Sequence, residues 1–127
     1  FRTPFSSNNW SEEKFNLQGG NVYNNGVGLT VRIINEFLEK NSLSISDFDY
    51  IVPHQANINM IHEVAQLLHV SMEKFLMNIE KFGNTGGASV LLSLSHHLMD
   101  GTLKKGDRIL LVSFGAGYTL AVVDTYL

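Results

Sequence analysis

The feature that most limits the fold is a regular alternation of short apolar runs and longer amphipathic stretches. From Gly26 to Lys40 the apolar residues recur at helical spacing, which predicts an amphipathic helix. The apolar run from Tyr50 to Val52 is closed by Pro53, as a buried strand would be. Because helix and strand patterns keep alternating after it, we predict an α/β domain with a mixed sheet and flanking helices.

After this strand the pattern returns to a helix. Asn57 is placed to cap it, because its side chain can accept a hydrogen bond from a free backbone N–H of the first turn. The stripe expected to face the core is Ile58, Ile61, Val64, Ala65 and Leu68. A short strand is then predicted from Leu76 to Ile79.

A further helix and a pair of strands complete the pattern. The helix starts at about Ala88, and Gly101 stands where a left-handed C-terminal cap belongs. Its expected buried residues are Val90, Leu91, Leu94 and Leu98. After a turn from Lys104 to Asp107, the β-rich runs Ile109–Phe114 and Thr119–Tyr126 predict a hairpin.

The composition is that of one globular domain, since 44% of the 127 residues are hydrophobic and 17% are charged. Residues 1–16 are polar and lack periodicity, so we assign them to an irregular N-terminal segment and residues 17–127 to the domain. The sequence begins with Phe1 rather than Met, and we expect it to be a piece of a longer protein. It contains no cysteine and therefore supplies no thiol nucleophile.

Charge and hydropathy disfavour several kinds of partner. The net charge is −3 and the Lys and Arg residues are scattered, so neither a nucleic acid nor a membrane surface is an expected partner. No apolar run approaches the roughly 20 residues that a bilayer crossing needs, and no basic segment leads into an apolar signal core. The lack of cysteine fits a reducing cytosol, and we expect a cytoplasmic location.

The first unusual loop, Val52 to Asn57, places His54 between the strand and the next helix. Free backbone N–H groups at a helix start carry a positive field, which disfavours imidazolium and keeps the ring neutral. A neutral ring can donate one hydrogen bond. The alternative is a buried structural histidine bonded to a backbone carbonyl.

The second loop, Phe82 to Ser89, is rich in glycine and contains Asn84. Its small residues let the backbone approach a ligand closely, and the Asn84 amide can donate a hydrogen bond into the resulting cleft. Asn84 could equally serve only as a helix cap. A phosphate-binding loop is a further alternative, although the Lys of a Walker motif is absent.

The third loop, Ser113 to Tyr118, contains the turn Gly115-Ala116-Gly117. A backbone N–H in such a tight turn can point at a developing oxyanion, and glycine permits the close approach. The alternative is a hairpin turn that needs a positive φ.

The remaining histidines do not form the pattern of a metal site. His62 and His69 have no carboxylate partner at ligand spacing, and His96 and His97 point to two different helix faces. We expect all four to be surface or packing residues. Ser89 lacks the Gly-x-Ser-x-Gly flanks of a nucleophile elbow, so we interpret it as an ordinary helix residue.

Taken in order, the three loops resemble those of a known family. The motifs are Val-Pro-His-Gln-Ala-Asn after a strand, then Gly-Asn-Thr, then Ser-Phe-Gly-Ala-Gly in the last hairpin. As a set they are similar to the C-terminal half of β-ketoacyl-acyl carrier protein synthase III, from about Leu17 to Leu127. The resemblance implies half of a duplicated thiolase-like fold, whose active site combines His and Asn with a Cys from the N-terminal half.

The resemblance also implies a role for individual residues. His54 and Asn84 match the catalytic His and Asn, and the Ala116 backbone N–H matches the oxyanion-hole donor. The matching active-site lining residues are Phe114, Gly115 and Gly117. The residues that match the pantetheine entrance are Ala56 and Asn57.

The implied activity is that of an acyltransferase of fatty acid or related biosynthesis. An acyl group is taken onto the cysteine, malonyl-acyl carrier protein (malonyl-ACP) loses carbon dioxide, and the enolate attacks the acyl-enzyme. Two neutral donors, His54 Nε2–H and the Asn84 amide, can stabilise the enolate oxygen. The implied substrates are thioesters of coenzyme A and phosphopantetheine, such as acyl-CoA and malonyl-ACP, with no further cofactor. A homodimer is implied for the full-length protein, and the fragment alone is expected to be inactive.

Two positions depart from the family pattern. Asn59 replaces an Arg that fatty-acid members often use to contact the acyl carrier protein, and the helix from Ile58 to Leu68 has no Lys or Arg. We therefore expect weak carrier docking. Gly86-Gly87 replaces the more usual Ser-Ala, which leaves room beside Asn84 for a different acyl chain. Two alternatives stay open, a non-condensing acyltransferase of the same family and a non-catalytic partner subunit.

Overall fold

The computed structural model describes residues 19–127, and the predicted irregular segment 1–16 lies outside the described residues. The longer elements are α1 (Gly19–Lys40), β1 (Tyr50–Pro53), α2 (Ile58–Leu67), α3 (Ile79–Phe82), α4 (Ser89–Met99), β2 (Arg108–Gly115) and β3 (Thr119–Tyr126). Short 3-10 turns occur at η1 (Ile45–Asp47), η2 (Met72–Lys74), η3 (Gly86–Ala88) and η4 (Ala116–Tyr118). Helices and strands alternate, which confirms the predicted α/β class.

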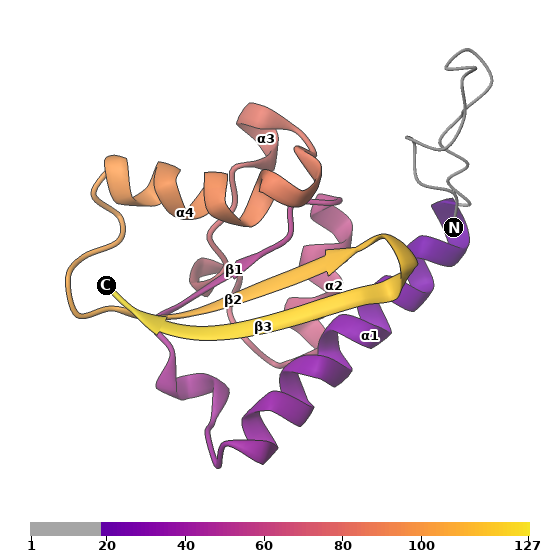
Figure 1. Ribbon diagram of the computed structural model, residues 1–127, viewed down its shortest axis with the longest axis horizontal. Helices are drawn as coiled ribbons and strands as arrows, with labels where there is room; N and C mark the ends of the chain where they lie inside the picture. The colour runs from indigo at the N-terminus through magenta and orange to yellow at the C-terminus, as the bar shows by residue number, and fades with distance from the viewer. Residues whose placement is uncertain (1–18) are drawn as a thin grey trace, which may run out of the picture.

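The three strands form one mixed sheet in the order β1-β2-β3 (Figure 1). β1 and β2 are parallel, whereas β2 and β3 are antiparallel, from Arg108 opposite Tyr126 to Gly115 opposite Thr119. The predicted mixed sheet and terminal hairpin are therefore confirmed. Parallel pairing brings the carboxyl ends of β1 and β2 to the same edge of the sheet, where ligand sites of α/β proteins lie.

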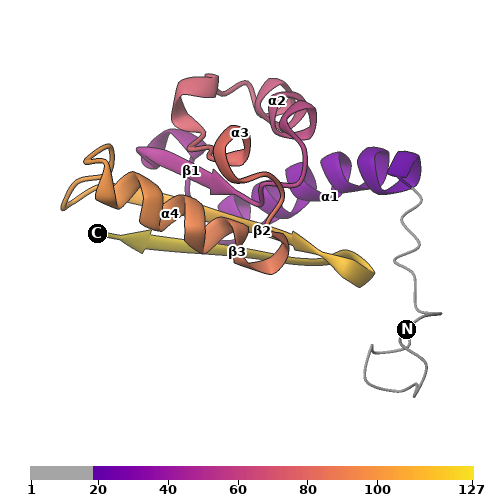
Figure 2. The same cartoon turned by 90° about the horizontal axis from the view of Figure 1, so that it is seen from above.

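Helices pack on both faces of this sheet, and Figure 2 shows β1 between α2 and α4. The larger core, beneath α1 and α2, contains Val27, Ile34, Leu38, Phe48, Ile51, Ile61, Val64, Ala65, Phe75, Leu110 and Val112. The smaller core, beneath α4, contains Val52, Leu76, Val90, Leu103 and Ile109. Since successive strand residues point to opposite faces, neighbours such as Ile51 and Val52 belong to different cores.

The second helix agrees with its prediction, and the first starts earlier than predicted. The Asn57 side chain accepts the Asn59 N–H at 2.8 Å and so caps α2. α1 begins at Gly19 rather than near Gly26, although residues 19–25 are rich in Gly and Asn and have weak helix propensity. A tertiary contact supports this part of the helix, because Asn25 Nδ2 donates to the Tyr118 hydroxyl at 3.3 Å.

The strand predicted from Leu76 to Ile79 is wrong. One bridge pairs Phe75 with Ile51, and the Leu76 N–H donates to Ile51 O at 2.9 Å, but the chain then turns into α3. Beyond Leu76 a side chain takes the place of a neighbouring strand, since the Gln55 amide bonds Leu76 O and the Asn78 N–H. An apolar run of this length does not distinguish a strand from such a buried link.

The face of α4 that packs on the sheet also differs from the prediction. Leu91 is 65% exposed and Leu98 is 44% exposed, so the predicted stripe is wrong at these two positions. The helix residues that are buried instead are Ser89, Val90, Ser93 and His97. Because α4 has apolar residues on more than one side, the sequence pattern does not identify the face that meets the sheet.

The predicted C-terminal cap of α4 and the predicted turn after it are both present. Gly101 has a φ of 79°, the predicted left-handed conformation, and the Asp107 N–H donates to Lys104 O at 3.1 Å in the following turn. Within residues 19–127, none of the helices combines the length and the apolarity that a membrane span requires.

The exposed apolar side chains of α4 predict that the 127-residue chain associates with itself when it is produced alone. These side chains are Leu91, Leu92, Leu98 and Met99. Sedimentation should show oligomers that grow with concentration, and the double substitution Leu91→Lys with Met99→Lys should reduce them. Gln66→Lys, at an exposed position of α2, should leave the oligomers unchanged. A monomer at every concentration would contradict this account of the α4 surface.

Candidate functional site

His54 lies at the carboxyl end of β1. Its backbone N–H donates to Val112 O at 2.7 Å, which extends the pairing with β2 beyond Pro53, a residue that has no N–H of its own. The ring is half-buried, and this burial lowers the pKa of His54 below its ordinary value of 6.5. The lowered pKa agrees with the predicted neutral ring, but its cause is burial and not the positive field of a helix start.

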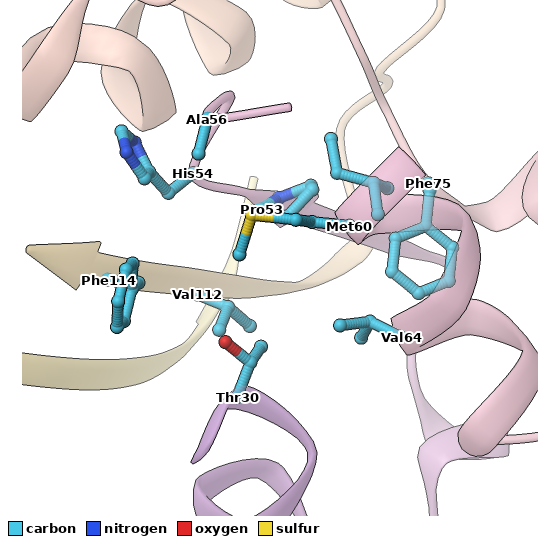
Figure 3. Close-up of a pocket in the computed structure, with 10 residues that line it drawn as sticks. Thr30, Pro53, His54, Ala56, Met60, Val64, Phe75, Val112 and Phe114 are labelled. Carbon is cyan, nitrogen blue, oxygen red and sulfur yellow. The ribbon is translucent and has the colours of Figure 1, made fainter. Parts of the chain in front are cut away.

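An apolar pocket lies beside His54, with an empty volume of about 390 Å³ that includes space open to solvent. Figure 3 shows His54, Ala56 and Phe114 at one end of it, and Val64 and Phe75 at the other. The walls of this pocket are mostly apolar, and the His54 ring at one end can donate a hydrogen bond to the polar group of a ligand.

Helix α1 forms one wall of this pocket through Thr30. The Thr30 hydroxyl is satisfied within the helix, because it donates to Gly26 O at 2.7 Å. A Cβ on Gly26 would lie 2.7 Å from Met60 Cε and 3.3 Å from Phe114 Cζ. Glycine at this position leaves room for the Met60 and Phe114 side chains. The sequence analysis missed Gly26, Thr30 and Met60, because their proximity depends on how the helices pack.

The second loop holds Asn84 in a local turn. Gly83 has a φ of 67° and a ψ of −162°, a conformation that is essentially restricted to glycine. The exposed Asn84 side chain accepts the Gly86 N–H through Oδ1 at 2.9 Å, so the Nδ2 group is its donor end. Asn84 is not the cap of α4, whose N-cap residue is Ala88. The cap alternative is therefore wrong for this helix.

Ser89 joins the second loop to the first. It is the first residue of α4 and is fully buried, and its Oγ lies 2.5 Å from His54 Nδ1. The same oxygen accepts the Gln55 N–H at 3.1 Å. The interpretation of Ser89 as an ordinary helix residue was incomplete, since it contacts the predicted catalytic His. No sequence spacing rule links a helix start to a histidine this far away in the chain.

Gln55 is also fully buried, and both ends of its amide are bonded. Nε2 donates to Pro53 O at 2.8 Å and to Leu76 O at 3.3 Å, while Oε1 accepts the Asn78 N–H at 3.2 Å. The residue that follows His54 therefore fastens the end of β1 to the segment that leads into α3. The Gln55 side chain thus holds the backbone that follows His54.

The tip of the terminal hairpin contains the third predicted loop. Gly117 has a φ of 74° and Tyr118 a φ of 55°. The loop is therefore a hairpin turn with positive φ, which was the alternative interpretation of this loop. The rings of Phe114 and Tyr118 have centroids 6.1 Å apart. Ala116 lies in this turn, two residues after Phe114.

The structure therefore brings three of the predicted site residues to one pocket, namely His54, Ala56 and Phe114. Among the described side chains, the predicted site residues that do not line this pocket are Asn57, Asn84, Gly115 and Gly117. Asn57 is exposed at the start of α2, and the loop of Asn84 reaches the pocket region through Ser89.

The other histidines behave as surface or packing residues, as predicted. His62 and His69 are exposed, and His97 is buried with Nδ1 at 2.8 Å from Ser93 O. His96 is partly exposed, with Nε2 at 3.9 Å from Asp100. In the part of the chain that the structure describes, no three His, Asp or Glu side chains gather as metal ligands would.

With this geometry established, comparison with known proteins decides the family. The model for the C terminal of 3-oxoacyl-[acyl-carrier-protein (ACP)] synthase III matches residues 38–124. The chain belongs to this family. It is 44% identical over 106 residues to the β-ketoacyl-[acyl-carrier-protein] synthase III of Clostridium novyi (strain NT), covering 84% of this chain and 33% of that protein. The corresponding protein of Acholeplasma laidlawii is 41% identical over 110 residues, which are 87% of this chain and 35% of the relative.

Solved structures of synthase III proteins share the fold. That of Pseudomonas aeruginosa PAO1 superposes with a TM-score of 0.87 at 33% identity, covering 98% of this chain and 38% of that one. That of Aquifex aeolicus VF5 gives 0.83 at 32% identity, with 87% and 36% covered. The predicted thiolase-like fold is confirmed, and the chain spans about a third of the length of the synthase III proteins that it matches.

The buried amide of Gln55 predicts a large loss of stability on truncation. Gln55→Ala should lower the free energy of unfolding by about 3 kcal/mol, because it leaves a cavity and buried backbone groups without partners. Gln66→Ala, the same change at an exposed position of α2, should alter stability by less than about 0.5 kcal/mol. Urea denaturation measures both, and equal effects would contradict the role given to Gln55.

The burial of His54 predicts a dependence of stability on pH. Its folded pKa lies below the ordinary 6.5, so under acid conditions the unfolded chain binds the proton more readily. Stability should therefore fall as the pH drops below 6.5 and should be unaffected by this residue above it. An NMR titration should find the His54 ring titrating below 6.5, and His54→Gln should remove this contribution. A ring that titrates at or above 6.5 would contradict the account.

Proposed function

We propose that this chain is the C-terminal catalytic part of a β-ketoacyl-ACP synthase III-type acyltransferase. The reaction would be the decarboxylative Claisen condensation of an acyl thioester with malonyl-ACP, in fatty acid or related biosynthesis. The observation that carries this proposal is a half-buried, neutral His54 at the end of an apolar pocket, joined through Ser89 to the loop of Asn84.

The chemistry requires hydrogen-bond donors for one developing negative charge. When the bond between the malonyl carboxyl group and the α-carbon breaks, carbon dioxide leaves and the electron pair moves toward the thioester oxygen. His54 Nε2–H and the Asn84 Nδ2 group are neutral donors, so they can stabilise that oxygen without giving up a proton to solvent. Preorganised neutral donors of this kind act most strongly where water is excluded, and the half-buried position of His54 fits this role.

The second half of the reaction needs a group from outside this chain. The enolate carbon forms a bond to the acyl carbon, and the thiolate that held the acyl group leaves. The sequence contains no cysteine, so that thiol belongs to another part of the complete protein in this proposal. Ala116 would supply its backbone N–H to the oxygen of the acyl group, with Gly115 and Gly117 completing the turn.

The proposed substrates are thioesters of coenzyme A and phosphopantetheine, and no further cofactor is needed for these steps. Ala56 in the pocket wall and the exposed Asn57 next to it support a pantetheine entrance at the start of α2. Acyl-CoA and malonyl-ACP as substrates, a homodimer and a cytoplasmic location are part of the same proposal, and they are based on the family.

Asn84→Ala in the complete protein tests the proposal most cleanly, because His54 can also assist formation of the thiolate. The loss of one oxyanion donor is worth about 3 kcal/mol, so decarboxylation of a malonyl thioester should slow roughly a hundredfold. Acylation by an acyl thioester should persist. The two assays are release of carbon dioxide and the mass of the acylated protein.

The matched control for this variant is Asn35→Ala, which changes an exposed Asn on α1 and should leave both assays unchanged. His54→Ala should also abolish decarboxylation. Normal decarboxylation by Asn84→Ala would contradict a condensing site, and a non-condensing acyltransferase or a non-catalytic subunit would then replace it.

Weak carrier docking is a separate prediction about the surface of α2. Acyl carrier proteins are acidic, whereas α2 has no Lys or Arg and exposes Asn59. Association should therefore depend little on salt, and Asn59→Arg should raise the association rate at low ionic strength. Asn35→Arg on α1 adds the same charge elsewhere and should have a smaller effect. A steep salt dependence without any substitution would contradict docking at this face, which has no Lys or Arg.

A further inference from the structure

The buried bond between Ser89 and His54 determines which ring nitrogen can act on a ligand. Ser89 is completely buried, and its Oγ has two partners among residues 19–127: the Gln55 N–H at 3.1 Å and His54 Nδ1 at 2.5 Å. A backbone N–H can only donate, so Oγ accepts from Gln55. The hydroxyl hydrogen still needs an acceptor, because buried polar groups in proteins are nearly always bonded.

Within the described residues, His54 Nδ1 is the one acceptor in contact with this hydroxyl. A neutral imidazole carries one proton, so an Nδ1 that accepts from Ser89 places that proton on Nε2. The other tautomer would direct two N–H donors at Oγ and leave the buried hydroxyl hydrogen without an acceptor. The bond from Gln55 thus decides the direction of the bond to His54.

We infer that Ser89 is a positioning residue, which holds His54 as the neutral Nε2–H tautomer. The two ring nitrogens lie on different edges of the ring, so Nε2–H is left available to a ligand while Nδ1 is occupied. The catalytic meaning of this tautomer rests on the proposed function, in which Nε2–H donates to the enolate oxygen. Ser89 also begins α4, the helix that follows the loop of Asn84.

The tautomer can be measured without any assay of activity. The complete protein that carries this chain would be labelled with ¹⁵N-histidine, and the His54 signals assigned by their loss in His54→Gln. Above pH 6.5 the ring nitrogen shifts and couplings should show a protonated Nε2 and an unprotonated, hydrogen-bonded Nδ1. A proton on Nδ1 would overturn the inference.

Two substitutions of Ser89 test its positioning role. Ser89→Ala removes the donor, so the two tautomers should exchange and the two nitrogen shifts should move toward each other. Decarboxylation should fall roughly 10- to 100-fold, by analogy with the loss of the partner that orients a metal-binding His. Ser89→Thr keeps a hydroxyl and should restore the Nε2–H spectrum.

The matched control is Ser93→Ala, one turn further along α4. Ser93 is as deeply buried as Ser89, but its hydroxyl donates to Leu76 O at 3.1 Å instead of meeting His54. It should leave the His54 spectrum unchanged. Unchanged shifts in Ser89→Ala, or the same shift changes in Ser93→Ala, would overturn the inference.

These measurements also distinguish the inference from the proposed function. A protein with the expected tautomer that releases no carbon dioxide from malonyl thioesters would support the positioning role and overturn the condensing reaction. A protein that decarboxylates with its proton on Nδ1 would support the condensing reaction, but it would overturn the positioning role of Ser89 and the donor role of His54 Nε2.

Discussion

The parallel pairing of β1 with β2 is the constraint on which the site depends. It sends both strands toward the same edge of the sheet, so that His54, just after β1, and Phe114, near the end of β2, share one pocket. An antiparallel pairing would place these residues at opposite edges. The polar residues of the site can therefore remain on loops while the strands beneath them belong to the two cores.

Buried polar side chains then hold these loops in place. Gln55 fastens the end of β1 to the segment before α3, and Ser89 connects His54 to the start of α4. Such bonds are directional, so they orient the groups around them, whereas apolar contacts mainly fix their distance. His54 is thereby held half-buried, in surroundings that favour its neutral form.

Much of this fold could be predicted from the sequence, because the core faces of α1 and α2 and the strands β1, β2 and β3 follow simple periodicities. The errors occur where local pattern and tertiary contact disagree. The run from Leu76 to Ile79 has the pattern of a strand, but the Gln55 amide bonds the backbone of this segment in place of a neighbouring strand. In α4 the side chains that face the core include Ser89 and Ser93, whereas Leu91 is exposed. His54 and Asn84 were predicted as site residues from motifs, whereas the contact of Ser89 with His54 is recognisable only once the chain is folded.

The central claim is that His54 and Asn84 act together on one oxygen of the substrate. The most direct test is a crystal structure of the complete protein with a malonyl thioester analogue that cannot lose carbon dioxide. The account predicts that the thioester oxygen lies within about 3.2 Å of both His54 Nε2 and Asn84 Nδ2, the range of a hydrogen bond. An analogue whose thioester oxygen contacts neither side chain would contradict it.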